Sequence, residues 1–181
     1  MINSHFIKQI DEITNEYKSK FAHLSKDELN WKPDSSVWSI AQNIDHLIVI
    51  NSTYFPIIAE IRNGSYQLPF VAKFAFLVNI FGRAILKSVQ ADRRRKMKTF
   101  TIWEPSKSEI ADDILILFET HQTELKNIIK ESTDLIKRGT VISSPANKMV
   151  VYKLDTAFQI IITHERRHLE QAKELLELMP K

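Results

Sequence analysis

The residues of this chain best suited to chemistry are two histidines four positions apart, His164 and His168, with a third far upstream, His46. In a helix, residues i and i+4 lie on one face because about 3.6 residues make a turn. Both imidazoles can then reach one metal ion. An imidazole from another helix would complete a three-histidine site that keeps open positions for water or substrate. The spacing therefore predicts a metal site.

The same string also reads H-E-x-x-H, in which Glu165 would be the general base of a metalloprotease. This short motif arises often by chance, and no histidine follows His168 to serve as third ligand. Because neighbouring residues are about 100° apart around a helix, we expect Glu165 at the rim of the site, paired with Arg166, Arg167 or a residue of a neighbouring helix. It remains a weak catalytic candidate. A second one is His121, which interrupts an apolar stripe and is otherwise a hydrogen-bonded core residue.

Composition favours one helical domain covering residues 1–181, since 44% of the chain is hydrophobic and only 3 residues are glycine. The chain has no cysteine. Disulfides, zinc–thiolate sites and a cysteine nucleophile are therefore excluded. Any thiol that takes part in the chemistry must come from a substrate.

The formal net charge of +3 is concentrated in the basic run from Arg93 to Lys98. No nucleic-acid-binding motif accompanies this run, so we expect no nucleic-acid partner. The most apolar segment, from Phe70 to Leu86, is interrupted by polar residues and is shorter than the ~20 residues of a membrane span. We therefore expect a cytoplasmic protein without stable membrane insertion. The segment itself would line a pocket, contact a second subunit or touch a membrane surface.

Apolar periodicity predicts four long amphipathic helices, over residues 2–24, 39–63, 106–131 and 153–178, with an inserted helix within 69–90. Capping boxes begin the second helix at Ser39 and the third at Ser106. Pro56 is expected to kink or break the second helix, and Gly64 to end it. His46 lies on this second helix, whereas His164 and His168 lie on the last. The expected fold is all-α, a four-helix bundle with an additional helix between the second and third main helices.

Residues 38–47, W-S-I-A-Q-N-I-D-H-L, followed far downstream by H-x-x-x-H-x-x-Q, resemble the signature of the DinB-like (YfiT-like) family of metalloenzymes. Residues 29–33, L-N-W-K-P, resemble the stretch before the family's tryptophan. The likeness covers nearly the whole chain. Many relatives have Arg-Gly where this chain has Leu169 and Glu170, so roles tied to that pair do not carry over.

The resemblance implies an up-and-down bundle whose interior holds a divalent metal on His46, His164 and His168. Gln171 matches a glutamine that often follows the histidine pair, and Gln42 lies one turn before His46, so both are expected to support the ligands. Imidazole ligands favour zinc or nickel, with iron and manganese as alternatives. Relatives often form dimers, so a homodimer is expected.

The resemblance also implies a reaction. Some relatives are metal-dependent transferases or isomerases that use a low-molecular-weight thiol such as bacillithiol, mycothiol or glutathione. The metal would hold the thiolate, which attacks an electrophilic small-molecule substrate. Two alternatives stay open. One is a small metal-dependent hydrolase that uses metal-bound hydroxide, and the other is a non-enzymatic protein that binds a metal, a ligand or a partner.

Overall fold

The computed structural model describes residues 3–90, 103–105, 109–111 and 113–180. The basic run from Arg93 to Lys98 lies outside the described residues. The elements follow one another along the chain as α1 Ser4–Phe21, α2 Lys26–Asn30, α3 Ile40–Ser52, α4 Tyr54–Asn63, η1 Phe70–Lys73, α5 Ala75–Ser88, α6 Ile114–Glu131, α7 Thr133–Lys137, β1 Val141–Ser144, β2 Asn147–Lys153 and α8 Leu154–Leu178.

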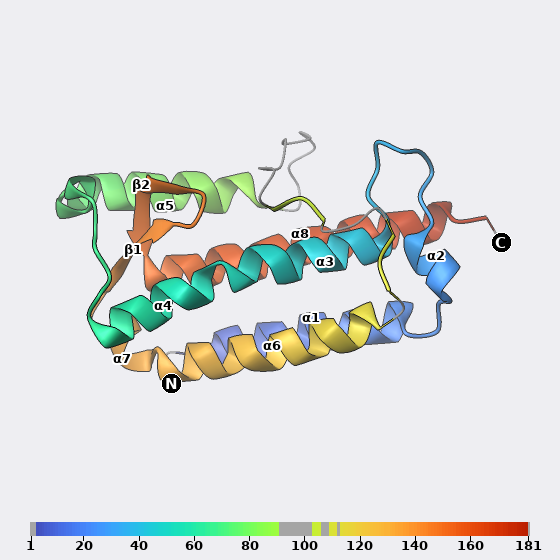
Figure 1. Cartoon of the computed structure of the whole chain (residues 1–181), viewed down its shortest axis with the longest axis horizontal. Helices are drawn as coiled ribbons and strands as arrows, with labels where there is room; N and C mark the ends of the chain where they lie inside the picture. The colour runs from blue at the N-terminus through green and yellow to red at the C-terminus, as the bar shows by residue number, and fades with distance from the viewer. Residues whose placement is uncertain (1–2, 91–102, 106–108, 112, 181) are drawn as a thin grey trace.

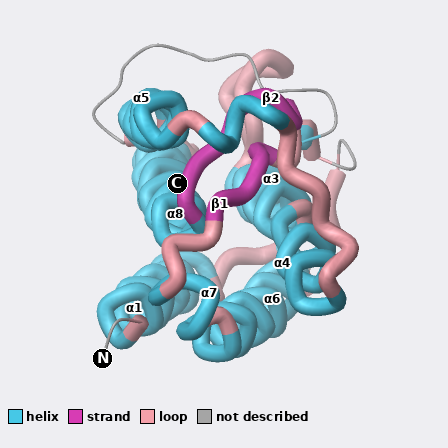
Figure 2. Tube along the Cα trace, turned by 90° about the vertical axis from the view of Figure 1, so that its left-hand side faces the viewer, coloured by secondary structure: helices cyan, strands magenta, loops and turns pink. Residues whose placement is uncertain are grey.

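The described chain is mostly helical, which agrees with the predicted all-α class. The long helices α1 and α3 each pack against both α6 and α8, and α4 prolongs α3 after a short break (Figure 1). Viewed along their axes, these helices surround a common interior, and α5 lies outside it beside a small hairpin (Figure 2). The predicted apolar stripe of α1 is confirmed, because Phe6, Ile10, Ile13, Tyr17 and Phe21 are all buried.

The second predicted helix is divided into α3 and α4 just before Pro56, as expected for a proline inside a helix. Pro56 has no N–H to donate to the carbonyl of Ser52, and α3 ends at Ser52. A new helix, α4, continues to Asn63, where Gly64 adopts a φ of 77° and ends it as predicted. The capping box at Ser39 is also confirmed: its side chain accepts from the Gln42 N–H, and the Gln42 side chain accepts from the Ser39 N–H. This cap fixes the start of the helix that carries His46.

The start predicted for the third long helix is wrong. The helix begins at Ile114, while Glu109 lies in an irregular segment, 2.7 Å from Lys26 in an ion pair. The capping box expected at Ser106 lies outside the described residues. Leu117 is 49% exposed, although apolar periodicity predicts it on the inward stripe of this helix. The buried side of α6 instead carries Ile114, Phe118, His121, Gln122, Leu125 and Ile129.

The connection before the last helix contains a β-hairpin that the sequence did not predict. β1 and β2 are antiparallel, with Ile142 opposite Tyr152 and Ser143 opposite Val151. β2 leads directly into α8 and packs against α5. The inserted helix approaches this hairpin closely at Gly82, where a Cβ would lie 3.1 Å from Thr156 Cγ2 and 3.3 Å from Tyr152 Cβ. The hairpin therefore positions α5 over the N-terminal half of α8.

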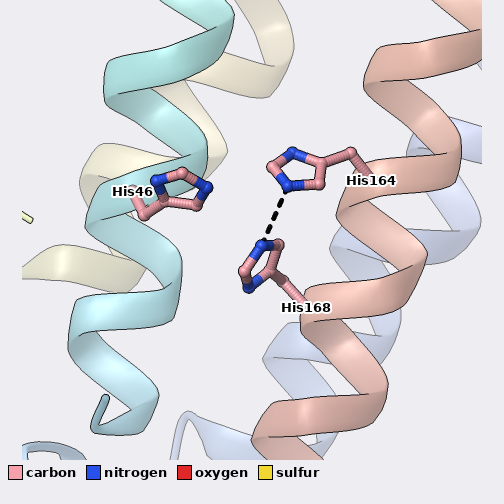
Figure 3. Close-up of side chains that lie close together, drawn as sticks. All are labelled: His46, His164 and His168. Atoms are coloured by element: carbon pink, nitrogen blue, oxygen red, sulfur yellow. Dashed lines mark hydrogen bonds between the residues drawn. The ribbon is translucent and has the colours of Figure 1, made fainter. Parts of the chain in front are cut away.

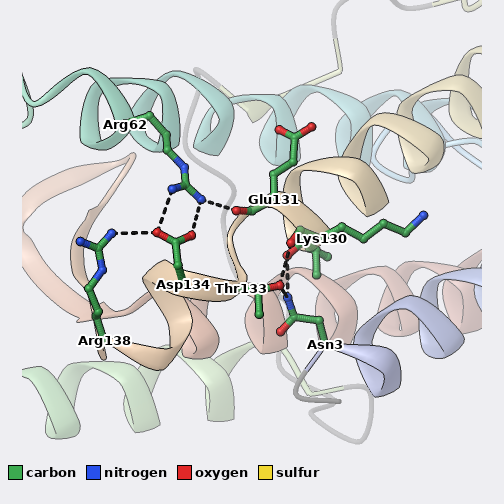
Figure 4. A network of polar contacts seen from close by, with 8 residues as sticks. Asn3, Arg62, Lys130, Glu131, Thr133, Asp134 and Arg138 are labelled. Carbon is green, nitrogen blue, oxygen red and sulfur yellow. Dashed lines mark hydrogen bonds and ion pairs between the residues drawn. The ribbon is translucent and has the colours of Figure 1, made fainter.

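A polar network joins the ends of α4 and α7 on the surface (Figure 4). Arg62 donates to both carboxylate oxygens of Asp134, at 2.9 and 2.6 Å, and to the carbonyl of Glu131. Arg138 donates to the same carboxylate at 3.0 Å. The hydrogen bonds from Arg62 lower the pKa of Asp134 to about 2. The network ties the far end of the α3–α4 segment to the segment that follows α6.

None of the helices within the described residues has the length and apolarity that crossing a lipid bilayer requires.

Candidate metal centre

Three histidines from two adjacent helices meet at one point. His46 projects from α3, and His164 and His168 project from successive turns of α8, so that the three rings face one another (Figure 3). One potential ligand atom from each ring lies within 4.8 Å of the others. The Nε2 atoms of His164 and His168 are 3.0 Å apart. The structure thus brings together the three residues that the sequence predicted as ligands.

The spacing of His164 and His168 fits a shared ion, while separations of up to 4.8 Å within the triad would have to shorten for all three rings to bind it. With metal–nitrogen distances of about 2.0–2.1 Å, two nitrogens on one ion are separated by roughly 2.9 Å at a right angle and roughly 3.3 Å in a tetrahedron. The 3.0 Å between the two Nε2 atoms falls inside this range. The chemistry of the donor set also fits a divalent transition metal, because imidazole nitrogen is a preferred ligand of zinc and nickel.

Hydrogen bonds assign the protonated nitrogen in two of the rings. His46 Nδ1 lies 2.5 Å from the carbonyl oxygen of Trp103, which only accepts, so Nδ1 carries the proton. His168 Nδ1 lies 2.7 Å from Asn43 Oδ1. The Asn43 amide nitrogen donates to the Ser39 carbonyl at 2.8 Å, which orients the amide oxygen toward His168. Both rings therefore present the lone pair of Nε2 to the centre of the triad.

The three imidazoles are neutral at pH 7. Burial lowers the pKa of His46, and the Trp103 carbonyl only partly opposes this effect. Burial, reinforced by the neighbouring imidazoles, lowers the pKa of His164 to about 3 and that of His168 well below its usual value. Neutral imidazole is the form that binds metal, so the site does not have to release a proton before an ion enters.

The triad lies in a cavity of about 990 Å³ that opens to solvent. The indole of Trp38 stacks on the His168 ring, with 18° between their planes, and lies 4.9 Å from the His46 ring centroid. Away from the triad the walls are mainly apolar. They come from α3, α5, the hairpin and α8, and include Ile50, Ile85, Val89, Val150, Ile160 and Ile161. The volume and lining are those of a small-molecule site.

Glu165 occupies a different position from the one expected. The sequence predicted it at the rim of the site, but the structure buries it completely in the helical interior. Its Oε1 accepts a hydrogen bond of 2.8 Å from Asn51, and burial raises the pKa of Glu165 to about 7. The pKa of Tyr17 on α1 is also raised, by burial and then by the charge of Glu165. Glu165 thus faces α1 and α3 and is not among the residues that line the cavity.

His121 is likewise a core residue. It is buried on α6, its ring stacks on Phe55 at 5.4 Å, and burial lowers its pKa to about 4. It is not among the residues that line the cavity. The two residues expected to support the ligands, Gln42 and Gln171, both line the cavity, and Gln42 also forms the capping box with Ser39.

Two supports of the ligands were missed in the sequence. Asn43 lies three residues before His46 on α3, and this spacing on one helix face could have identified it. No sequence pattern could have identified the Trp103 carbonyl. It is a backbone acceptor 57 residues away from His46, and only the fold brings the two together.

Comparison with known proteins agrees with the predicted family. No curated protein and no solved structure matches the chain. The family model of the DinB superfamily, whose members bind metal, matches residues 9–172, a range that includes all three histidines. The chain therefore belongs to the DinB superfamily.

Proposed function

We propose that this protein is a divalent-metal enzyme of the thiol transferase type, with the metal held by Nε2 of His46, His164 and His168. The observation that carries the proposal is the position of the triad, whose potential ligand atoms come together in a solvent-open cavity of about 990 Å³. A purely structural metal site is usually closed by four protein ligands. Within the described residues the cluster has three, which leaves coordination positions for exogenous molecules.

The three ligands determine how much positive charge a bound ion would keep. Three neutral imidazoles add no negative charge, so a bound divalent ion keeps its full charge and would lower the pKa of a coordinated thiol. Asn43 and the Trp103 carbonyl hold two of the rings in the metal-binding tautomer. The ligand set favours zinc or nickel over iron and manganese. Since the chain has no cysteine, the thiol is a second substrate.

The walls of the cavity indicate the kind of electrophile. Ile50 on α3, Ile85 on α5, Val89 directly after α5, and Ile161 on α8 surround the space beside the triad. These side chains exclude water and offer contacts to an apolar body. We therefore propose an electrophile whose reactive carbon is attached to an aliphatic or aromatic group. The sulfur of the thiol forms a bond to that carbon as the leaving group departs with the bonding electrons.

The hydrolase alternative is less well supported, since it requires a base beside the attacking water. The two residues considered for this role, His121 and Glu165, are core residues and do not line the cavity. A purely structural metal protein does not account for an open cavity above the three ligands, whereas a ligand-binding protein without catalysis does, and the conjugation assay below separates it from an enzyme. The proposed enzyme would be an up-and-down four-helix bundle, which the packing of α1, α3, α6 and α8 supports, and a homodimer.

The test is a conjugation assay with metal-loaded protein. Bacillithiol, mycothiol, glutathione and cysteine are each combined with apolar epoxides and halides, and the thioether is detected by mass spectrometry. We expect metal-dependent product with at least one thiol, and its loss in His46→Ala. The same substitution at the exposed His23 is the matched control and retains activity. Absence of product across the panel with fully metal-loaded protein would contradict the proposed reaction.

A further inference from the structure

Exposed apolar side chains lie on the outer side of the inserted segment, where they do not pack against the core. We name the residues Phe70, Phe74, Phe76 and Ile80 the aromatic patch. Phe70 is 69% exposed and Phe76 is 60% exposed. The ring centroids of Phe70 and Phe74 are 5.5 Å apart, and those of Phe74 and Phe76 are 6.1 Å apart. The patch is therefore continuous, unlike the scattered apolar residues common on protein surfaces.

The packing of α5 uses a different face. Val78 and Gly82 are buried, and Ile85 and Val89 pack against the core. On the opposite side, exposed residues at positions 76, 80, 83 and 87 follow the 3-4 spacing of a single helical stripe. A helix with apolar residues on both faces is normally covered on both. The fold covers only one face of α5.

The charged residues of the segment that carries the patch are all basic. From residue 61 to residue 91 the sequence contains no aspartate or glutamate. Lys73, Arg83 and Lys87 are exposed, as is Lys148 on the neighbouring hairpin. None of these four forms an ion pair within the part of the chain that the structure describes. The Lys73 ammonium group lies 5.0 Å from the Phe70 ring centroid, so a cation stands directly beside the aromatic side chains.

We infer that the aromatic patch and its basic border bind the surface of a membrane that contains anionic lipids. Phenylalanine and isoleucine enter the boundary between headgroups and acyl chains, while lysine and arginine keep their charges at the phosphates. A second copy of the chain is a poorer fit. A two-fold contact through this face would bring the basic border of one copy against that of the other, without acidic partners.

Membrane binding would also orient the cavity. The inner side of α5 contributes Ile85 and Ser88 to the cavity that contains the triad, and Val89 follows directly after the helix. A bilayer on the outer side of the same helix would lie one helix diameter, about 10 Å, from that cavity. The inference about the membrane depends neither on the metal nor on the proposed reaction.

The test is co-sedimentation of the full chain with vesicles. One set contains phosphatidylcholine alone, and the other contains about one-third phosphatidylserine. We expect binding to the anionic vesicles, at least about tenfold weaker binding to the neutral ones, and release as salt is raised from ~0.1 M to ~0.5 M. Two triple variants, Phe70→Ser/Phe76→Ser/Ile80→Ser and Lys73→Glu/Arg83→Glu/Lys87→Glu, should each lose at least about tenfold in vesicle affinity.

The matched control removes exposed apolar residues elsewhere. Ile116 and Leu117 on α6 are 68% and 49% exposed, and the double variant Ile116→Ser/Leu117→Ser should bind vesicles as the wild type does. Circular dichroism and light scattering accompany every variant to check folding and oligomeric state. The inference is overturned if folded wild-type protein stays in the supernatant with anionic vesicles, or if the patch variants bind them normally. It is also overturned if the patch variants only convert a dimer to a monomer.

Discussion

Asn43 and His168, 125 residues apart in the sequence, are joined by a hydrogen bond of 2.7 Å between Oδ1 and Nδ1. The Asn43 side chain is itself anchored to the Ser39 carbonyl at the start of α3. The capped end of α3 thus determines which nitrogen of a histidine on α8 is available to a metal. Two consecutive hydrogen bonds, from Asn43 to the Ser39 carbonyl and from His168 to Asn43, thus connect the start of α3 to the histidine tautomer.

The first prediction concerns this contact. Asn43→Ala removes the acceptor from His168 Nδ1 and should weaken zinc or nickel binding by about 10- to 100-fold, since outer hydrogen-bond partners typically contribute this much. Asn43→Asp keeps the acceptor and should bind nearly as well as the wild type. Competition titration with a chromogenic chelator measures both affinities. Equal affinities for the alanine variant and the wild type would show that the contact does not hold the ligand.

A second prediction concerns pH. His121 has a pKa of about 4 in the fold because it is buried, against an ordinary value near 6.5. Below pH 6.5, His121 binds a proton in the unfolded chain but stays neutral in the folded chain. The folded state therefore loses stability as pH falls from about 6.5 toward 4. His121→Gln removes this contribution. Urea unfolding of metal-free protein should show that the variant loses less stability than the wild type between pH 7 and 4.5, by at most about 3 kcal/mol.

Other groups titrate over the same range, so the difference between the two proteins is the quantity to be compared. Parallel stability curves for His121→Gln and the wild type would mean that His121 takes up its proton in the folded state as readily as in the unfolded one.

The close approach at Gly82 gives a third prediction. Valine at this position would press on Thr156 and Tyr152, which lie 3.1 and 3.3 Å from a Cβ built there. We expect Gly82→Val to destabilise the fold by about 1–3 kcal/mol through overpacking. Ala84→Val introduces the same side chain at an exposed position of α5 and should cost well under 1 kcal/mol. Thermal unfolding of the two variants distinguishes a tight helix–hairpin contact from a loose one.

A fourth prediction tests the apolar wall of the cavity. Val89→Ser should raise KM for an apolar electrophile roughly tenfold, because it removes about 1–2 kcal/mol of apolar contact with the substrate. Metal content and the rate at saturation should change little. Ala84→Ser, on the exposed side of the helix that precedes Val89, is the control. A fall in kcat at unchanged KM would place Val89 outside the substrate-binding wall.

Local patterns predicted the parts of this structure that depend on local physics. The apolar stripe of α1, the capping box at Ser39, the helix end at Gly64 and the position of α8 are properties of adjacent residues, and the structure has them. The two histidines on α8 share a face for the same reason. His46 required the family resemblance in addition, since no local pattern connects α3 with α8.

The features that sequence reasoning missed depend on contacts between distant segments. The β1–β2 hairpin forms in a stretch read as a connection, and its β2 strand is covered by α5. Glu165 was expected at the rim because it lies about 100° from His164 around the helix, whereas the fold turns this side of α8 into the interior, where Asn51, 114 residues away, donates to it. The helix predicted from residue 106 begins at Ile114, and Glu109 before it forms an ion pair with Lys26, a contact between distant segments.

The metal content of the purified protein tests the central claim most directly. Elemental analysis of protein prepared without chelator or histidine tag should find about one divalent ion per chain in the wild type and in the control His23→Ala. Protein with His46→Ala should contain a small fraction of that amount while keeping its helical circular dichroism. Equal metal content in His46→Ala and the wild type, or none in folded wild-type protein after exposure to zinc and nickel, would contradict the account.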